Sequence, residues 1–295
     1  MTSTPAMQSS IQIPISKIGQ WADTSAIQQK KRHFFLMRII SSLGILATLV
    51  SLLDFPPQRA ILCTLIGMMI LLSVLPFGSE SERNWYNQRA LAESIKTFEW
   101  RLLVGSQSVS AAEISRGMRE ISEPFLAKLS IENKVDCPGF DDSFSRYLEG
   151  TSGATFSSRK TIYLEERLKN QRDWYHQKAK IHGRNWWRLR TAYVSFLIVG
   201  LIFVALGQFL DSLIPVLLAL GAFVAAENSA SQNLLVASAY LIAEEELNAI
   251  IEQIPSVTEV QWSEFVNDAE ESISREHVSW RASKGIFLGK RNDNK

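Results

Sequence analysis

Cysteine and histidine are scarce in this chain, and its charges nearly cancel. The 295 residues include two cysteines and four histidines, and the formal net charge is +1. Cys63 lies in an apolar run and Cys137 in a loop-like stretch, so we predict no disulfide and a reducing compartment. No histidines have zinc-site spacing, and a near-neutral chain lacks the basic face that nucleic-acid binding requires. We therefore expect no metal, no cofactor and no nucleic-acid partner.

Motifs for catalysis are also missing. The sequence has no nucleophile elbow, no P-loop and no dinucleotide fingerprint. The histidines lie outside the apolar runs, and His176 and His182 are six residues apart, so they point to different faces of a helix. We therefore predict that the protein is not an enzyme and that it has no catalytic residues.

What the chain does have is four apolar runs, which cover residues 34–53, 60–77, 191–210 and 213–226. A helix of about 20 residues spans about 30 Å, the thickness of the hydrocarbon core of a bilayer. Asp54-Phe55-Pro56-Pro57 breaks the first pair of runs and a short turn breaks the second, which predicts two transmembrane hairpins. The fourth run is short, and its alternative interpretation is a buried helix in a soluble core.

Basic residues predict the orientation of these hairpins. They precede or enter the first and third runs, while the two hairpin turns carry almost no charge: Lys30, Lys31, Arg32, Arg38, Lys178, Lys180, Arg184, Arg188 and Arg190. The positive-inside rule places such flanks in the cytoplasm. We therefore predict a multi-pass protein of the bacterial cytoplasmic (inner) membrane with both termini in the cytoplasm.

The segments between the runs have helical signals. We predict helices over 80–104, from Ser110 to a stop or kink at Pro124 with a further turn to about Leu129, from about Ser157 through the third run, and without a break over 227–254. Ser110 with Glu113, and Ser256 with Glu259, have the spacing of capping boxes, the second of which would begin a last helix. We interpret the acids of that last helix as solvated or as partners of Arg275 and nearby lysines: Glu264, Asp268, Glu270, Glu271 and Glu276.

The order of these segments repeats. Each half has a polar segment with a tryptophan, then two apolar runs, then a long amphipathic helix. We predict an all-α membrane protein with two transmembrane helical hairpins (four spans), whose long cytoplasmic helical extensions pack as a bundle. The units are residues 1–130 and 157–295, and residues 131–156 form a linker rich in Gly, Ser, Asp and Pro.

Small and polar residues line one face of two spans. On the first span they are Ser41, Gly44, Thr48 and Ser51, and on the fourth they include Ala219, Ala222, Ala226 and Ala230. Such stripes let membrane helices approach closely, so we predict helix packing. The alternative is the lining of a pore, but rings of charge, which pores often use, are missing from the runs.

Three motifs carry a resemblance to a known family. The first lies between Trp85 and Arg101, with Glu93 and Trp100 inside it. The second has the pattern Y-x3-R-x3-Q-x2-W-Y-x2-K: Tyr163, Arg167, Gln171, Trp174, Tyr175 and Lys178. The third is Ser274-Arg275-Glu276-His277 with Trp280. Together they resemble the bacterial SLATT family, the "SMODS and SLOG-associating two-transmembrane effector" domains, in a tandem form that covers nearly the whole chain.

The resemblance implies a membrane effector of bacterial conflict (antiphage) systems. Its members are associated with nucleotide second-messenger synthetases or nucleotide sensors, and their proposed action is oligomerisation and perforation of the membrane. It therefore implies a homo-oligomer in the lipid bilayer, with a nucleotide-sensing or synthetase partner encoded nearby.

Two alternatives stay open. The protein could be a non-pore membrane scaffold or sensor whose long cytoplasmic helices bind a partner. The third motif could be a ligand or signal site, although we expect Arg275, Glu276 and Trp280 to dock the last helix onto the helix around Tyr163–Trp174.

Overall fold

Helices are the only regular elements in the part of the chain that the structure describes. This computed structural model describes residues 16–74, 77–105, 110–132, 144, 148, 153–206 and 211–283; side chains are not described at 77–83, 127–132, 211 and 275–283. The predicted all-α class is confirmed for these residues. The chain folds as two compact units, and each unit takes residues from both halves of the sequence.

Unit 2 comprises residues 28–83 and 176–241 and contains the apolar runs. Its helices include α1 (Lys17–Ser51) from residue 28 onward, α2 (Gln58–Val74), α7 (Asn170–Leu206) from residue 176 onward, and α8 (Ile214–Ser231). Among the residues that the structure describes, three helical stretches are long and apolar enough to cross a membrane: Lys17–Ser51, Phe156–Leu206 and Ile214–Ser256. Of the helices that contain the four apolar runs, α2 is the shortest, with 17 residues. The helix of the fourth run belongs to the long stretch Ile214–Ser256.

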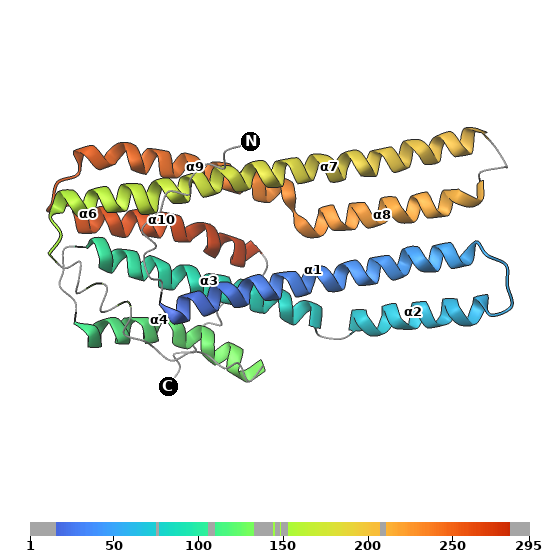
Figure 1. The fold of residues 1–295 in the computed structure, drawn as a ribbon, viewed down its shortest axis with the longest axis horizontal. Helices are drawn as coiled ribbons and strands as arrows, with labels where there is room; N and C mark the ends of the chain where they lie inside the picture. The colour runs from blue at the N-terminus through green and yellow to red at the C-terminus, as the bar shows by residue number, and fades with distance from the viewer. Residues whose placement is uncertain are drawn as a thin grey trace, which may run out of the picture. The chain divides into compact units, whose positions relative to one another are not determined.

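Side-chain contacts connect the helices of unit 2 in pairs. The Gln58 amide donates to the carbonyl oxygens of Val50 and Ser51, each at 3.2 Å, and so satisfies the end of α1 from the start of α2. A Cβ on Gly44 would lie 3.5 Å from Met69 Cε, and one on Gly221 would lie 3.8 Å from Phe196 Cβ. Small residues therefore bring α1 close to α2 and α8 close to α7, as Figure 1 shows.

The expected unbroken helix over 227–254 is wrong at one residue. Gln232 has a φ of 47° and separates α8 from α9 (Asn233–Gln253). Its backbone N–H donates to the Asn228 carbonyl at 3.2 Å, which closes α8. The Asn233 amide donates to Ser231 Oγ at 2.6 Å and its oxygen lies 2.8 Å from His182 Nδ1. Local polar partners therefore hold a left-handed residue in place of a glycine.

Unit 1 comprises residues 1–27, 84–175 and 242–295. It contains the start of α1, most of α3 (Phe77–Val104), α4 (Ala111–Glu132), α6 (Phe156–Ile162), the π-helical segment η1 (Tyr163–Lys169), the start of α7, the end of α9, the turn η3 (Ile254–Ser256) and α10 (Trp262–Ser283). Ile18, Leu91, Ile95 and Phe125 are buried together in one core cluster. A second cluster joins Ile114, Met118 and Phe144.

Helix α4 confirms one expectation and corrects another. Ser110 N and Oγ both donate to Glu113 Oε2, at 2.9 and 2.7 Å, so the predicted capping box is present. Of the two outcomes predicted at Pro124, a stop or a kink, the stop is wrong, because α4 continues to Glu132. Phe125, directly after the proline, is 7% exposed in the core, and its burial favours continuation of the helix there.

The second capping box lies two residues later than predicted. Thr258 N and Oγ1 donate to Gln261 Oε1 at 3.3 and 2.8 Å, while Ser256 Oγ donates backward to the Gln253 carbonyl at 2.8 Å. Pro255 explains the shift, because it is part of the turn η3, which ends at Ser256. Helix α10 then begins at Trp262.

Candidate functional site

Three aromatic side chains from separate segments form the centre of unit 1. Tyr163 and Trp262 are each 0% exposed, and their rings meet edge to face with centroids 5.8 Å apart. Trp100 also meets Tyr163 edge to face, with centroids 6.1 Å apart. Trp262 Nε1 donates to the Val104 carbonyl at 2.7 Å, which fixes α10 to the last turn of α3. The aromatic cluster therefore joins α3, η1 and α10.

A buried ion pair lies beside this cluster. Arg167 Nε and Nη2 donate to Glu270 Oε1 and Oε2 at 2.8 and 2.7 Å, and the two side chains are 2% and 0% exposed. Tyr163 Oη also donates to Glu270 Oε1, at 3.1 Å. Burial, with the Glu270 charge adding to it, raises the pKa of the Tyr163 hydroxyl well above its usual range. The carboxylate is thus paired in the two-pronged geometry typical of strong Arg–carboxylate contacts.

The π-helical segment positions this group. Tyr163 and Arg167 both belong to η1, a wider turn inside the helical stretch Phe156–Leu206. Thr155 begins that stretch by accepting a hydrogen bond from Ser158 N at 3.3 Å. π-Helical turns are frequent at functional sites, and this one coincides with the start of the second predicted motif.

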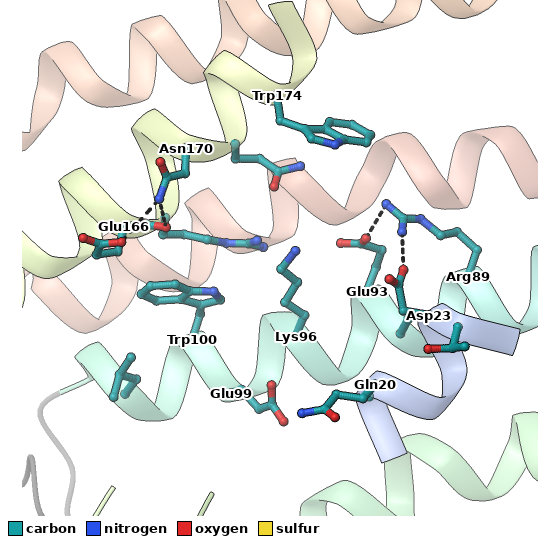
Figure 2. A pocket seen from close by; sticks show the side chains of 16 residues that line it. Gln20, Asp23, Arg89, Glu93, Lys96, Glu99, Trp100, Glu166, Asn170 and Trp174 are labelled. Atoms are coloured by element: carbon teal, nitrogen blue, oxygen red, sulfur yellow. Dashed lines mark hydrogen bonds and ion pairs between the residues drawn. The ribbon is translucent and has the colours of Figure 1, made fainter. Parts of the chain in front are cut away.

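A cavity of about 510 Å³ adjoins the ion pair within unit 1. Its walls come from α1, from α3, and from η1 with the start of α7: Gly19, Gln20, Asp23, Thr24, Arg89, Ala92, Glu93, Lys96, Glu99, Trp100, Leu103, Glu166, Arg167, Asn170, Gln171 and Trp174. Figure 2 shows Lys96 rising from α3 between Trp100 and Glu93, toward the helix that carries Asn170 and Trp174. The volume lies within the range of small-molecule sites in proteins.

The carboxylates on the cavity wall all have partners. Arg89 bridges Asp23 and Glu93, at 2.7 and 2.6 Å. Glu99 Oε1 accepts from Ser16 N at 2.9 Å, and Glu166 Oε2 accepts from the Asn170 amide at 3.4 Å. Other groups of the protein therefore hold one oxygen of each carboxylate, while Glu93 Oε2 is buried without a hydrogen bond. Among the described residues there is no group of three or more His, Cys, Asp or Glu side chains that could hold a metal ion.

Lys96 also lines the cavity, but its charged group is not paired as these carboxylates are. Within the described part of the chain its ammonium has no hydrogen-bond or ion-pair partner, although it lines the cavity. Burial lowers the pKa of Lys96 from its ordinary value of 10.5, and the nearby charges of Arg167 and Arg89 act in the same direction. The negative charges of Glu93 and Asp23 oppose this shift but do not cancel it.

Five of the predicted motif residues line the cavity together: Glu93, Trp100, Arg167, Gln171 and Trp174. Tyr163 lies behind the wall in the aromatic cluster, and Tyr175 is 1% exposed. Arg101 Nη2 donates to the Asn267 carbonyl at 3.1 Å, and Trp85 stacks on Tyr86 with centroids 4.5 Å apart. Lys178 belongs to unit 2 and lies outside this group.

The third motif is described only in part. Ser274 Oγ donates to the Glu271 carbonyl at 3.0 Å on α10. The side chains of Arg275, Glu276, His277 and Trp280 lie outside the described residues, although their backbone belongs to α10. Helix α10 does contact the segment around Tyr163, but through Trp262 and Glu270.

Sequence reasoning did not single out three residues of this site: Lys96, which lies within the first motif, Trp262 and Glu270. The interpretation of Glu270 as solvated is wrong, because it is fully buried and paired with Arg167. A signal was present in the sequence, since Val266, Glu270 and Ile273 follow one another at helical spacing on the buried face of α10. An acid inside such an apolar stripe indicates a buried partner.

The predicted packing residues of unit 2 lie at different depths. Ser41, Gly44 and Thr48 are half-buried on α1, and Ser51 is exposed. On α8, Ala219 and Ala230 are half-buried, whereas Ala222 and Ala226 are exposed and Gly221 is the buried position that faces α7.

Comparisons with known proteins match both halves of the chain to family models. Residues 18–134 match the model described as SMODS and SLOG-associating 2TM effector domain 3. Residues 163–280 match the one described as SMODS and SLOG-associating 2TM effector domain 1. No curated protein and no solved structure matches.

Proposed function

Because this chain belongs to the SLATT family and carries two of its domains in tandem, we propose that it acts by self-assembly in a membrane that it perturbs or perforates. The domains are two-transmembrane effector domains associated with conflict systems. The role in bacterial antiphage defence, the oligomer and the pore are the parts that we add. In this proposal the chain acts without catalysis.

The apolar surface of unit 2 is the observation that carries the proposal. Large apolar side chains project outward from its helices, among them Leu71, Leu201 and Leu218, which are 60%, 69% and 53% exposed. The most apolar windows of the three long helical stretches are only 0%, 6% and 6% buried. Exposed apolar surface on this scale marks contact with a membrane or with other protein. A lipid bilayer satisfies all of it at once.

We propose four spans in two hairpins, with α2 as the shortest. At 17 residues α2 has the lower length of a spanning helix, and it carries Arg59 as its only charged residue. Lys30, Lys31 and Arg32 precede the apolar part of α1, and Arg184 and Arg188 precede that of α7. This asymmetry supports cytoplasmic termini in the inner membrane.

The exposed small residues of α8 are the surface that we propose for self-assembly. Ala222 and Ala226 are one helical turn apart, and both are exposed in the single chain. Small side chains allow two membrane helices to approach closely, and packing is what drives their association in lipid. A second copy of the chain is the occupant that we assign to this face.

Membrane potential in expressing bacteria tests this function. Expression of the full chain should collapse the potential and admit a membrane-impermeant dye. Ala222→Leu and Ala226→Leu should reduce both effects at least tenfold, because the added side chain separates the helices. Ala205→Leu is the matched control, since Ala205 is also exposed but lies on α7. Equal activity of all three variants at equal membrane abundance would refute assembly through this face of α8.

The alternative function is a scaffold or sensor that binds a cytosolic partner without opening the membrane. The same experiment separates the two functions, because a scaffold leaves potential and dye exclusion unchanged under every activating condition. Either function accommodates a nucleotide synthetase or nucleotide sensor encoded nearby, and co-expression with that protein is the first activating condition to test.

A further inference from the structure

The part of α7 that precedes its apolar run carries basic residues and no acids. From residue 174 to residue 210 the sequence has no aspartate and no glutamate. Three exposed basic residues are spaced four apart in this segment, so they lie on one face of the helix. The basic face of α7, as we define it, consists of these three and of two residues between them: Lys180, Gly183, Arg184, Trp187 and Arg188.

The three basic side chains of this face have no counter-ion. Within the residues that the structure describes, none of the three has an ion pair or a hydrogen bond. Glu227 on the neighbouring helix α8 already pairs with Arg38 at 2.6 Å. Earlier in the same helical stretch, by contrast, Lys169 pairs with Glu165 at 2.6 Å. Like charges four residues apart destabilise a helix, so the basic face has a cost that the earlier segment avoids.

His182, which precedes Gly183 in the sequence, shows that the potential beside the basic face is positive. Burial lowers the pKa of His182, the contact with Asn233 opposes this shift, and the charges of Lys30 and Lys178 lower the pKa further. Lys30 belongs to α1 and Lys178 to α7, so the basic segments of both tandem domains act on one imidazole. An anion that approaches the basic face therefore meets positive charge from two helices.

The basic face is not covered by other parts of the chain. A Cβ on Gly183 would meet no atom within 4 Å apart from its own helix, and the side chain of Trp187 is 61% exposed. Trp187 lies four residues before Thr191, where the apolar run begins. Tryptophan is enriched where the hydrocarbon of a bilayer meets the headgroups. The basic face therefore lies at the level of the headgroups when the run spans a bilayer.

The same face of α7 continues as apolar surface. Val194, Ile198 and Leu201 follow Trp187 at the spacing of a single helix face, and they are 41%, 52% and 69% exposed. One continuous surface thus changes from basic to apolar along the helix. A phospholipid has the same order of groups, since a charged headgroup precedes its acyl chains. An acidic protein, the other occupant that charge alone would allow, leaves the apolar part unsatisfied.

From this surface we infer that the basic face of α7 binds the headgroups of anionic phospholipids. The lipid phosphate accepts hydrogen bonds from Arg184 and Arg188, and Lys180 adds a third positive charge. The acyl chains lie against the apolar residues that follow. The inference rests on the proposed placement of unit 2 in a bilayer, but it requires neither self-assembly nor perforation.

Quenching of tryptophan fluorescence by brominated lipids tests the inference on the full chain in nanodiscs. Trp186 and Trp187 are the two tryptophans within residues 28–83 and 176–241, so they report the lipid beside the basic face. Brominated phosphatidylglycerol and brominated phosphatidylcholine, each mixed with unlabelled phosphatidylcholine, give the relative affinity. We expect phosphatidylglycerol to bind about fivefold more tightly at low salt. Molar salt should abolish this preference, because it screens charges beyond about 3 Å.

Substitutions in the basic face provide the second arm. Arg184→Gln/Arg188→Gln should reduce the preference to below about twofold, whereas Arg184→Lys/Arg188→Lys keeps the charge and should retain most of it. Lys169→Gln/Arg172→Gln is the matched control, since it removes two charges from the same helical stretch that are paired with acids at 2.6 and 2.7 Å. Equal quenching by brominated phosphatidylcholine in all variants verifies that each is folded and inserted.

Two results would overturn the inference and leave the proposed function intact: equal affinity of the wild type for the two lipids, and an unchanged preference in Arg184→Gln/Arg188→Gln. Loss of the wild-type preference on addition of micromolar polyglutamate would also overturn it, because the face would then belong to an acidic protein. Absence of quenching by both brominated lipids is a different outcome. It would overturn the placement of unit 2 in a bilayer, and with it both proposals.

Discussion

Arg167 and Glu270 belong to different helices and are both almost fully buried. Glu270→Gln should therefore lower the free energy of unfolding of unit 1 by about 3–5 kcal/mol, because Arg167 then keeps its charge without a counter-ion. Chemical denaturation in detergent measures this change. Asp173→Asn is the control: its partner Arg172 lies 2.7 Å away at an exposed site, and loss of that pair should cost less than about 1 kcal/mol. Similar losses in the two variants would contradict a special role for burial.

Substitution of Lys96, unlike that of Glu270, should increase the stability of the protein. Lys96→Met should raise the thermal transition temperature of the full chain, because it removes a buried ammonium that lacks a partner. The expected increase in the free energy of unfolding is about 1–2 kcal/mol at neutral pH. A lower transition temperature for this variant would show that the ammonium stabilises the fold.

The stability difference between Lys96→Met and the wild type should depend on pH. The folded pKa is lowered below 10.5, so the unfolded chain binds more protons than the folded chain between those two values. Wild-type stability should therefore rise as the pH rises through this window toward 10.5, relative to Lys96→Met. Asp23, Arg89, Glu93 and Arg167 surround the ammonium in both proteins, so the difference between the two melting curves isolates Lys96. A difference that is constant with pH would refute the lowered pKa.

Individual residues were predictable from the sequence only where a motif marked them. Arg167, Gln171 and Trp174 were found because they repeat a family pattern, and they do line one cavity. Lys96 belongs to the amphipathic helix α3 and has no feature that separates it from a surface lysine. Its burial depends on α1 and η1, which lie far away in the sequence.

At the level of helices, the beginning of α10 offers a direct comparison of two caps. Gln261→Ala should destabilise unit 1 by about 1 kcal/mol, because Thr258 loses its partner at both N and Oγ1. Ser256→Ala should change stability by less than half of this, since its hydroxyl bonds only to the preceding turn. Thermal denaturation of the two variants decides between the two boxes, and a larger effect at Ser256 would favour the sequence-based assignment.

The junction between α8 and α9 depends on a left-handed residue. Gln232→Gly should leave stability unchanged or raise it by up to about 1 kcal/mol, because glycine adopts a φ of 47° without a steric penalty. Gln232→Val should lower it by about 1–2 kcal/mol, since a β-branched side chain disfavours this conformation. Thermal transitions in nanodiscs measure both changes. If the valine variant melted with the wild type, a continuous helix would be the better description.

The sequence was sufficient to predict the helices and most of their boundaries from composition and spacing. It did not predict where a helix is interrupted by a break or by a π-helical turn. The end of α3 at Val104 and the long helix from residue 156 to 206 follow from caps and from the lack of breakers. The break at Gln232 has no Gly or Pro to announce it, because Ser231, Asn233 and His182 supply its polar contacts. The π-helical turn at Tyr163–Lys169 is likewise set by tertiary contacts of Tyr163 and Arg167.

At the scale of the whole molecule, the ion pair between Arg38 and Glu227 connects the two tandem domains within unit 2. Arg38 of α1 and Glu227 of α8 lie 2.6 Å apart, with side chains 59% and 17% exposed. Arg38→Glu should therefore reduce the amount of folded protein in the membrane, because two carboxylates then face each other near lipid, where unpaired charges are costly.

The double variant Arg38→Glu/Glu227→Arg restores opposite charges and should recover most of the wild-type amount. Quantitative membrane fractionation and the thermal transition measure this recovery. A double variant no better than Arg38→Glu would show that the pair does not connect these helices in the membrane.

The interleaving of the two units has a consequence for how the protein can be divided. The cavity takes one wall from residues 19–103 and the other from residues 166–174, so a cut in the segment between α4 and α6 leaves neither fragment with a complete site. The two fragments would regain it only by complementation, as a one-to-one pair of unlike halves. A chain with a single domain would have to recruit a second subunit to build the same enclosure, whereas covalent fusion sets that stoichiometry at the moment of translation.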